Sequence, residues 1–235
     1  LPVVFCLDRA GLVGEDGPTH HGVFDMAYLR KIPGLTLASP RDGRELKMMM
    51  RYAYSHRSGP LAIRYPRGGV HEETESLLKE VNPAPIILGR SETLREGSDV
   101  LLIAIGSMVY VAQEAALRLA KQGVEATVLN ARFVKPLDEE AILRHARGKK
   151  LVLTIEEGSI AGGFGSAVLE LFETQKGIWP QIKILGIPDR FIEHGKREVL
   201  LDSLGLTASG IEARVLQYLQ FENLRNPDPG LIISR

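Results

Sequence analysis

The stretch DVLLIAIGSMVYVAQEAALRLAKQGVEATVLNA, residues 99 to 131, decides the fold class. Its first part, 99–106, is a short apolar run that is typical of a buried strand. Residues 109–122 have helical spacing and end at Gly123, and residues 125–131 form a second strand-like run. A strand, a helix and another strand in this order predict an α/β protein with a parallel sheet.

The alternation continues on both sides of this stretch. Further strands are predicted at 2–8, 35–39, 61–66, 150–157 and 181–188. Further helices are predicted at 24–32, 40–54, 138–147, 165–175, 196–204 and 209–221. Ser39 is expected to cap the helix of 40–54, with Pro40 at its first helical position.

The regular pattern breaks down from Gly68 to about Gly97. This region is rich in charge, and its last part, 85–97, predicts a hairpin. We therefore predict two parallel-sheet domains with a boundary near residue 80, spanning 1–80 and 81–235. The tail, NPDPGLIISR, is expected to be loosely held.

Composition limits the function classes. Lys+Arg and Asp+Glu are both 29 in 235 residues, so no overall charge attracts nucleic acid or an anionic membrane, and we expect neither as a partner. No apolar run approaches the ~20 residues of a membrane span. The single cysteine, Cys6, excludes an internal disulfide and fits a reducing compartment. We expect Cys6 to be a core residue rather than a nucleophile. Leu1 opens without Met or a signal pattern, which suggests a chain cut from a longer polypeptide.

The first motif with chemical potential is DRAGLVGEDGPTHHGVFD, residues 8–25, directly after a predicted strand. Its glycines allow tight turns and close approach to a ligand, and between them lie Arg9, Asp16, His20 and His21. Such a density of titratable side chains favours a functional loop over a merely polar one. A metal site from Asp16, His20 and His21 is an alternative, although no second cluster of ligand spacing supports it.

The second motif is IRYPRGG, residues 63–69, where Arg64 and Arg67 flank a strand end. A guanidinium matches the geometry of phosphate and carboxylate, so two arginines from different strand ends could hold a phosphorylated substrate. Salt bridges to neighbouring carboxylates are an equal alternative.

Two further features carry weaker signals. The Gly-rich turn IEEGSIAGGFGS, residues 155–166, could bind an anion at a helix start, but it lacks the Lys-Ser/Thr of a P-loop, so we favour a structural or interface role. His194 follows the predicted strand 181–188 and is either solvated or part of an active site.

Together these segments resemble the transketolase superfamily, and within it the 1-deoxy-D-xylulose-5-phosphate synthases. GEDGPTH (14–20) is similar to the same loop of transketolases, so it identifies the superfamily only. The pieces that resemble the synthases are DRAG (8–11), HGVFD (21–25), RYPRG (64–68) and RFVKPLD (132–138). The resemblance runs from Leu1 to about Gln220 and implies the later part of a transketolase-type pyrimidine-binding domain, followed by a transketolase C-terminal domain.

The resemblance implies a thiamine-diphosphate- and Mg²⁺-dependent condensation of pyruvate with D-glyceraldehyde 3-phosphate, in a cytoplasmic enzyme that supplies isoprenoid, thiamine and pyridoxal biosynthesis. By resemblance, Arg9 and Arg67 bind the acceptor phosphate. Asp16 orients the acceptor hydroxyl or the donor. His20 transfers a proton or donates a hydrogen bond near the thiazolium. The C-terminal domain is implied to serve assembly, as a homodimer or with an N-terminal cofactor-binding part, rather than to supply catalytic groups.

The family's magnesium motif and its activating glutamate lie upstream of Leu1 in the family pattern. The sequence therefore assigns no cofactor-binding residue and no metal ligand, and the chain alone is expected to be inactive. Two alternatives stay open: a transketolase-like ketol transferase, and a non-catalytic partner subunit that is active only beside a cofactor-binding chain.

Overall fold

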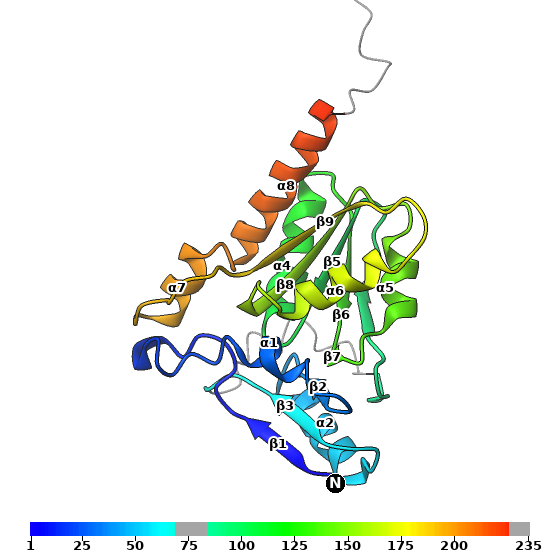
Figure 1. The fold of residues 1–235 in the computed structure, drawn as a ribbon. Helices are drawn as coiled ribbons and strands as arrows, with labels where there is room; N and C mark the ends of the chain where they lie inside the picture. The colour runs from blue at the N-terminus through cyan, green and yellow to red at the C-terminus, as the bar shows by residue number, and fades with distance from the viewer. Residues whose placement is uncertain (69–83, 226–235) are drawn as a thin grey trace, which may run out of the picture.

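A computed structural model of the protein describes residues 1–68 and 84–225, and the side chains of 1–68 and 84–220. The predicted domain boundary near residue 80 and the predicted loose tail lie outside the described residues. Figure 1 shows the first part of the chain below and the second part above, with helix α1 (Asp25–Leu29) between them.

The first sheet has four strands in the order β1-β3-β2-β7. Its strands are β1 (Val4–Leu7), β2 (Thr36–Ala38), β3 (Leu61–Arg64) and β7 (Phe133–Lys135). The first three run parallel, because β3 pairs in parallel with both β1 and β2. Strand β7 pairs antiparallel with β2 and comes from the second part of the chain, so the two parts share this sheet.

The second sheet has five strands in the order β4-β6-β5-β8-β9. Its strands are β4 (Glu92–Arg95), β5 (Val100–Ala104), β6 (Ala126–Asn130), β8 (Leu151–Ser159) and β9 (Gln181–Ile187). All neighbours are parallel except β4, which pairs antiparallel with β6. The predicted α/β class with mostly parallel sheets is confirmed, with an antiparallel strand at one edge of each sheet.

Helices cover both faces of the second sheet (Figure 1). Besides α1, the helices are α2 (Gly43–Ser55), α4 (Met108–Lys121), α5 (Glu139–Ala146), α6 (Phe164–Glu173), α7 (Arg197–Ser203) and α8 (Ala208–Arg225). One apolar cluster lies against α4 and α8 and includes Leu102 of β5. Leu101 faces the other cluster, with α5, α6 and residues of the first sheet such as Leu37. Alternate residues of β5 thus fill two cores, and one of them is shared by both parts of the chain. None of the helices in the described ranges is both long enough and apolar enough to span a bilayer.

Helix α2 begins later than predicted. The predicted cap at Ser39 is wrong: the N-cap is Asp42, whose side chain accepts a hydrogen bond from the Glu45 backbone N–H at 2.7 Å. Glu45 accepts in return from the Arg41 N–H at 2.7 Å, so an Asp-x-x-Glu pattern closes the first turn. The Ser39 N–H instead donates to the Arg132 carbonyl at 2.8 Å, so Ser39 lies before the turn that Asp42 begins.

The predicted hairpin of 85–97 does not form. A turn exists, since the Arg90 N–H donates to the Ile87 carbonyl at 3.0 Å, but β4 pairs with β6 instead of with the residues before the turn. Pro85 has no N–H to offer a ladder, and its carbonyl accepts from the Arg132 guanidinium at 3.3 Å.

The prediction that Cys6 is a core residue is also wrong. Cys6 is exposed, as are Val4 and Phe5 of the same strand, at 39% and 48%. The cause is the strand order: β1 lies at the sheet edge, with only β3 beside it. An apolar run indicates a strand, but it does not show whether other parts of the chain bury that strand.

Candidate functional site

The two arginine-bearing motifs meet because their strands are neighbours. Leu7 at the end of β1 pairs with Arg64 at the end of β3, so the loops that follow leave the same edge of the sheet. The connection continues past the strands, since the Tyr65 N–H donates to the Leu7 carbonyl at 2.9 Å and the Ala10 N–H donates to the Tyr65 carbonyl at 3.0 Å.

Arg9 and Arg67 converge on a single oxygen. Arg9 Nη1 lies 3.0 Å from Asp16 Oδ2, and Arg67 Nη1 contacts the same oxygen. We call Arg9 and Arg67 the arginine clamp. The two arginine side chains are 45% and 55% exposed and that of Asp16 is 31% exposed. Ion pairs this exposed contribute at most about 1 kcal/mol each, so an anion with more oxygens can displace the Asp16 carboxylate at little cost.

The loop of 8–25 is held in a defined shape. Gly11 and Gly22 exchange two backbone hydrogen bonds, at 2.8 and 2.9 Å, which close the loop at its base. Between them, the short 3-10 turn η1 (Gly14–Asp16) carries the Asp16 carboxylate toward the clamp. Gly11 and Gly17 both have φ +78, a left-handed conformation that residues with a side chain rarely adopt. The predicted tight turns are therefore present.

The two histidines of the loop differ. His20 is exposed, and its Nδ1 lies 2.9 Å from Thr19 Oγ1, so its ring is free to meet a ligand and is not part of the clamp's ion pairs. His21 is buried, and its Nδ1 accepts the Val13 N–H at 3.1 Å. A ring nitrogen that accepts from an amide carries no proton, so the proton of neutral His21 is on Nε2, which has no partner among the described residues.

The two arginines of the second motif also lie in different environments. Arg64 is buried, and its Nε donates to Asp25 Oδ2 at 2.8 Å. Its Nη2 reaches the carbonyls of Gly22 and Glu157, at 3.1 and 3.3 Å. Both arginines thus form the ion pairs of the salt-bridge alternative, Arg64 with Asp25 and Arg67 with Asp16, but Arg64 is buried and Arg67 is exposed.

The Gly-rich turn of 155–166 provides no open anion site. Glu156, which is buried, accepts hydrogen bonds from the backbone N–H groups of Phe164 and Gly165, both at 2.8 Å. The start of helix α6 is therefore occupied by the chain's own carboxylate. Burial raises the pKa of Glu156 to about 7, although these N–H groups and the charges of Arg64 and Arg30 act to lower it.

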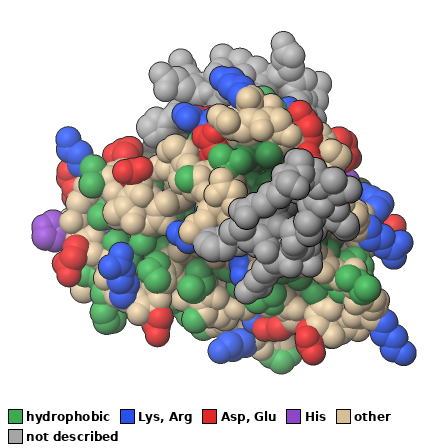
Figure 2. Space-filling model, turned by 90° about the horizontal axis from the view of Figure 1, so that it is seen from above, with side chains coloured by type: hydrophobic (Ala, Val, Ile, Leu, Met, Phe, Trp, Pro, Cys, Tyr) green, Lys and Arg blue, Asp and Glu red, His purple; other side chains and the backbone are tan. Residues whose placement is uncertain are grey.

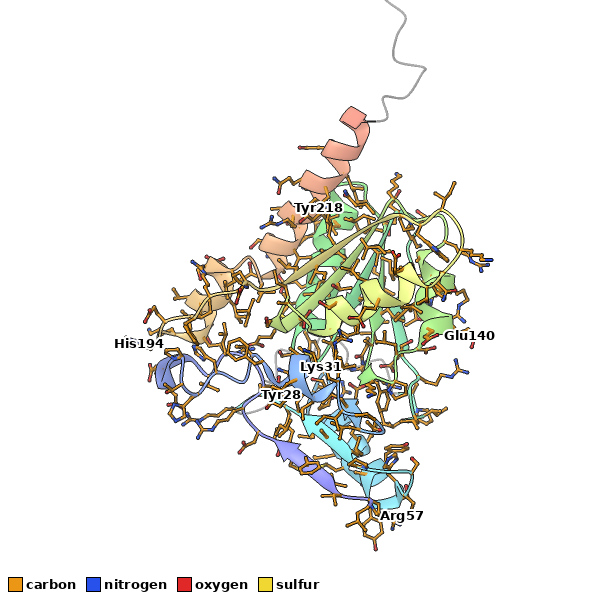
Figure 3. All side chains as sticks on the ribbon, in the orientation of Figure 1. Tyr28, Lys31, Arg57, Glu140, His194 and Tyr218 are labelled. Carbon is orange, nitrogen blue, oxygen red and sulfur yellow. The ribbon has the colours of Figure 1, made fainter. Side chains whose placement is uncertain are left out.

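The neighbouring Glu157 was missed by the sequence prediction. It is buried at the end of β8, and its Oε1 accepts the Leu12 backbone N–H from the loop of 8–25 at 2.8 Å. The available signal was a pair of acidic residues at the end of an apolar strand. His194 also lies at this loop, since a side chain added at Gly17 would meet its Cβ at 3.3 Å, and Figure 3 shows His194 beside the loop.

The metal-site alternative does not fit the geometry. Asp16 is engaged by two guanidinium groups, and His21 is turned inward by its bond to Val13. Within residues 1–68 and 84–225, no three His, Cys, Asp or Glu side chains gather in a way that could hold a metal ion. On the face drawn in Figure 2, acidic and basic side chains are interspersed rather than gathered by sign.

Comparisons with known proteins identify the family. The family model of the transketolase pyrimidine-binding domain matches residues 1–72, and that of the transketolase C-terminal domain matches residues 89–211. Because the second match spans more than half of the chain, the chain belongs to the transketolase family. The curated relatives narrow the resemblance to one enzyme of that family. The chain is 53% identical over 220 residues to 1-deoxy-D-xylulose-5-phosphate synthase 1 of Geobacter sulfurreducens, covering 93% of this chain and 34% of that protein.

A second relative gives the same result. The chain is 50% identical to the 1-deoxy-D-xylulose-5-phosphate synthase of Gloeobacter violaceus over 97% of this chain and 35% of that protein. The chain thus spans about a third of the length of the curated relatives that it matches.

Solved structures support the fold. A split-gene transketolase, described as an inactive β4 tetramer, is 32% identical with a TM-score of 0.78, covering 93% of this chain and 66% of that one. Transketolase from Campylobacter jejuni, at 23% identity, matches with a TM-score of 0.66 over 91% of this chain and 31% of that one, and it supports the fold alone.

Proposed function

We propose that this chain forms the acceptor-phosphate side of an enzyme that condenses pyruvate with D-glyceraldehyde 3-phosphate to 1-deoxy-D-xylulose 5-phosphate and CO₂. The convergence of Arg9 and Arg67 on one oxygen of Asp16 carries this proposal. Two guanidinium groups from separate strand ends, aimed at one point, suit a phosphate, which offers several oxygens to them. The names of the relatives support the choice of reaction.

In this proposal each residue of the loop has one task. Arg9 and Arg67 bind the acceptor phosphate, and Asp16 leaves the clamp as the phosphate enters. The freed Asp16 carboxylate then accepts a hydrogen bond from an acceptor hydroxyl. The exposed His20 imidazole gives a proton to the aldehyde oxygen as the new carbon–carbon bond forms, because imidazole can exchange protons near neutral pH.

The implied thiamine diphosphate supplies an electron sink for the carbon that loses CO₂. The described residues could contact the reacting side of such a cofactor, but they do not provide a site for its metal ion and diphosphate. His20 is exposed, whereas no cluster of three metal ligands is present within 1–68 and 84–225. We propose that Mg²⁺ and the diphosphate are held mainly by residues outside this chain.

The test is Arg67→Ala in the complete enzyme. The Michaelis constant for glyceraldehyde 3-phosphate should rise by about 30- to 160-fold, because one charge-assisted contact contributes about 2–3 kcal/mol. The Michaelis constant for pyruvate should change little. Steady-state kinetics with each substrate varied in turn measures both.

Arg51→Ala is the matched control. Arg51 is an exposed arginine on α2, away from the loop of 8–25, and the same substitution there should leave both constants unchanged. An equal rise for both substrates in Arg67→Ala would remove Arg67 from the phosphate site.

A second proposal concerns the chain by itself, as a partner subunit that is inactive alone. The similar split-gene transketolase that is described as an inactive β4 tetramer favours it. Calorimetry of thiamine diphosphate and Mg²⁺ against this chain should show no tight binding, and tight, magnesium-dependent binding would contradict the proposal. Xylulose 5-phosphate replacing pyruvate as donor would instead support a transketolase-like ketol transferase. The cytoplasmic location and the homodimer stay predictions.

A further inference from the structure

The loop of 8–25 is held in place by the C-terminal part of the chain. Leu12 lies between Arg9 and Asp16 in sequence, and its backbone N–H donates to Glu157 at 2.8 Å. The Leu12 side chain is buried in the apolar cluster of α4 and α8, together with Val23 from the other arm of the loop. Both arms of the loop therefore rest on the second sheet.

Glu157 is a buried carboxylate that binds three segments at once. Besides Leu12 it accepts the Ser107 hydroxyl, from the turn after β5, at 2.7 Å. It also accepts the Arg197 guanidinium at the start of α7, with Arg197 Nε at 3.2 Å from Oε1 and Nη2 on the other oxygen. A carboxylate buried to 2% exposure needs such partners, because an unpaired buried charge is costly.

The segment that carries Arg197 reaches the loop a second time. The Gly195 N–H donates to the Gly14 carbonyl at 3.3 Å, at the first residue of η1. A side chain added at Gly14 would meet the Gly195 carbonyl at 3.1 Å, and one at Gly11 would collide with the Glu157 carboxyl group. Figure 1 shows α7 directly beside the loop. Hydrogen bonds join Leu12 to Glu157, Glu157 to Arg197, and Gly195 to Gly14. The chain itself closes the ring, because Gly195 is close to Arg197 in sequence and Gly14 is close to Leu12.

We propose that Glu157, held by Arg197, is the positioning residue of the arginine clamp. This proposal rests on the proposed function of that clamp. Glu157 fixes the backbone at Leu12, and the backbone at Leu12 sets how Arg9 on one side and Asp16 on the other face Arg67. Phosphate binding by two guanidinium groups depends on their separation, so a small shift of the loop weakens it. The C-terminal domain thus contributes to acceptor binding and not to assembly alone.

A purely structural role makes a different prediction. If Glu157 only stabilised the fold, its loss would lower the unfolding midpoint and would affect both substrates alike. A positioning role acts on the acceptor selectively, because pyruvate does not use the clamp. The ratio of the two Michaelis constants separates these cases.

The experiment uses Glu157→Gln and Arg197→Gln in the complete enzyme. Gln at 157 has a single oxygen, so its NH₂ group must face at least one of the former donors. We expect the Michaelis constant for glyceraldehyde 3-phosphate to rise by about tenfold in Glu157→Gln, the loss of one charge-assisted hydrogen bond. The constant for pyruvate and the turnover number should stay within about twofold. Arg197→Gln should act in the same direction, and Arg197→Lys should recover part of the affinity.

Arg118→Gln is the matched control, because Arg118 is an exposed arginine of the same domain paired only with acidic side chains on the helices α4 and α8. Arg197 is 31% exposed, so its variants keep the test usable if Glu157→Gln fails to fold. A rise that is equal for both substrates, or no rise in either variant at 157 and 197, would overturn the proposal.

Two further readouts do not depend on the reaction. Hydrogen exchange at the Leu12 amide should be faster in Glu157→Gln than in the wild type, and inorganic phosphate should bind about tenfold more weakly by calorimetry. If the wild type does not condense pyruvate with glyceraldehyde 3-phosphate, the proposed function fails, and the phosphate titration still tests whether Glu157 positions the clamp. Unchanged exchange and unchanged phosphate affinity would refute the positioning role even in an active enzyme.

Discussion

Replacing Arg132 by Ala should be among the most destabilising single changes in this protein. Arg132 is 1% exposed and its guanidinium joins both parts of the chain. Its Nε donates to Glu45 of α2 at 2.7 Å, and its Nη2 lies 3.2 Å from Glu92 of β4. Nη2 also donates to the Ala84 carbonyl at 2.9 Å. Alanine keeps none of these contacts and leaves a cavity where the long side chain was.

The expected loss of stability depends on which hydrogen-bond partners Glu45 and Glu92 keep without Arg132. Breaking one partner of a buried ion pair costs about 3–5 kcal/mol. Glu45 keeps hydrogen bonds from Asn130 Nδ2, at 3.0 and 3.2 Å, and Glu92 keeps the guanidinium of Arg41. Neither acid is left bare, so we expect the low end, about 3 kcal/mol. Because Arg132 is almost fully buried, solvent screening does not reduce this value.

Urea unfolding, followed by circular dichroism, measures the change as a lower midpoint at an unchanged slope. Arg118→Ala is the control, since Arg118 is 45% exposed and its pair with Glu114 contributes about 0.5 kcal/mol or less. A loss below about 1 kcal/mol for Arg132→Ala, or one equal to that of the control, would refute the reasoning that this network holds the two parts together.

Three further predictions concern single side chains. Burial raises the pKa of Glu156 to about 7 from 4.5, so the folded state binds more protons than the unfolded chain between these values. The free energy of unfolding should therefore fall by up to about 3 kcal/mol as pH rises through this window, and Glu156→Gln, measured beside the wild type, should lack that part of the slope. Asp42→Ala removes the cap of α2 and also the acceptor of the Tyr110 hydroxyl, so it should cost at least about 1 kcal/mol in thermal unfolding, whereas Ser39→Ala, which removes no helix cap, should cost less. Asp16→Asn removes a negative charge from the arginine clamp, so inorganic phosphate should bind it more tightly by calorimetry, while a weaker affinity would contradict the displacement of Asp16 by phosphate.

The local patterns of the sequence predicted most of the elements. The run 99–131 forms β5, α4 and β6 within one residue of the predicted bounds at most ends, because strand and helix periods are local properties. Strand β7 was not predicted, because three residues carry no period and its partner β2 lies far away in sequence. The start of α2 was misplaced because both Ser39-Pro40 and Asp42 fit the rules for helix starts. Local rules do not choose between them, and the structure places the cap at Asp42.

In the candidate site, too, some features follow from local sequence patterns and others depend on tertiary contacts. The meeting of Arg9 and Arg67 could be expected once β1 and β3 are neighbours, because parallel strands end on one edge. The contact of Asp16 with both arginines could not, since it depends on side-chain positions. Glu157 could not be found by spacing, because 145 residues separate it from Leu12.

The two segments that match separate family domains are packed together as one structure. Strand β7 of the second part closes the first sheet, and Leu12 and Val23 of the first part are buried in the core of the second. The loop of 8–25 cannot satisfy its own backbone at Leu12, because the acceptor it uses is the carboxylate of Glu157. A phosphate clamp of two exposed arginines gains affinity only if their separation is fixed before the ligand arrives, and exposed side chains cannot fix it themselves. For the proposed clamp, that rigidity has to come from the backbone beneath it, and we propose that the second sheet supplies it through the bond from Leu12 to Glu157. Under the proposed positioning, sequence changes around β8 and α7 should also weaken acceptor binding, by less than the loss of a clamp arginine.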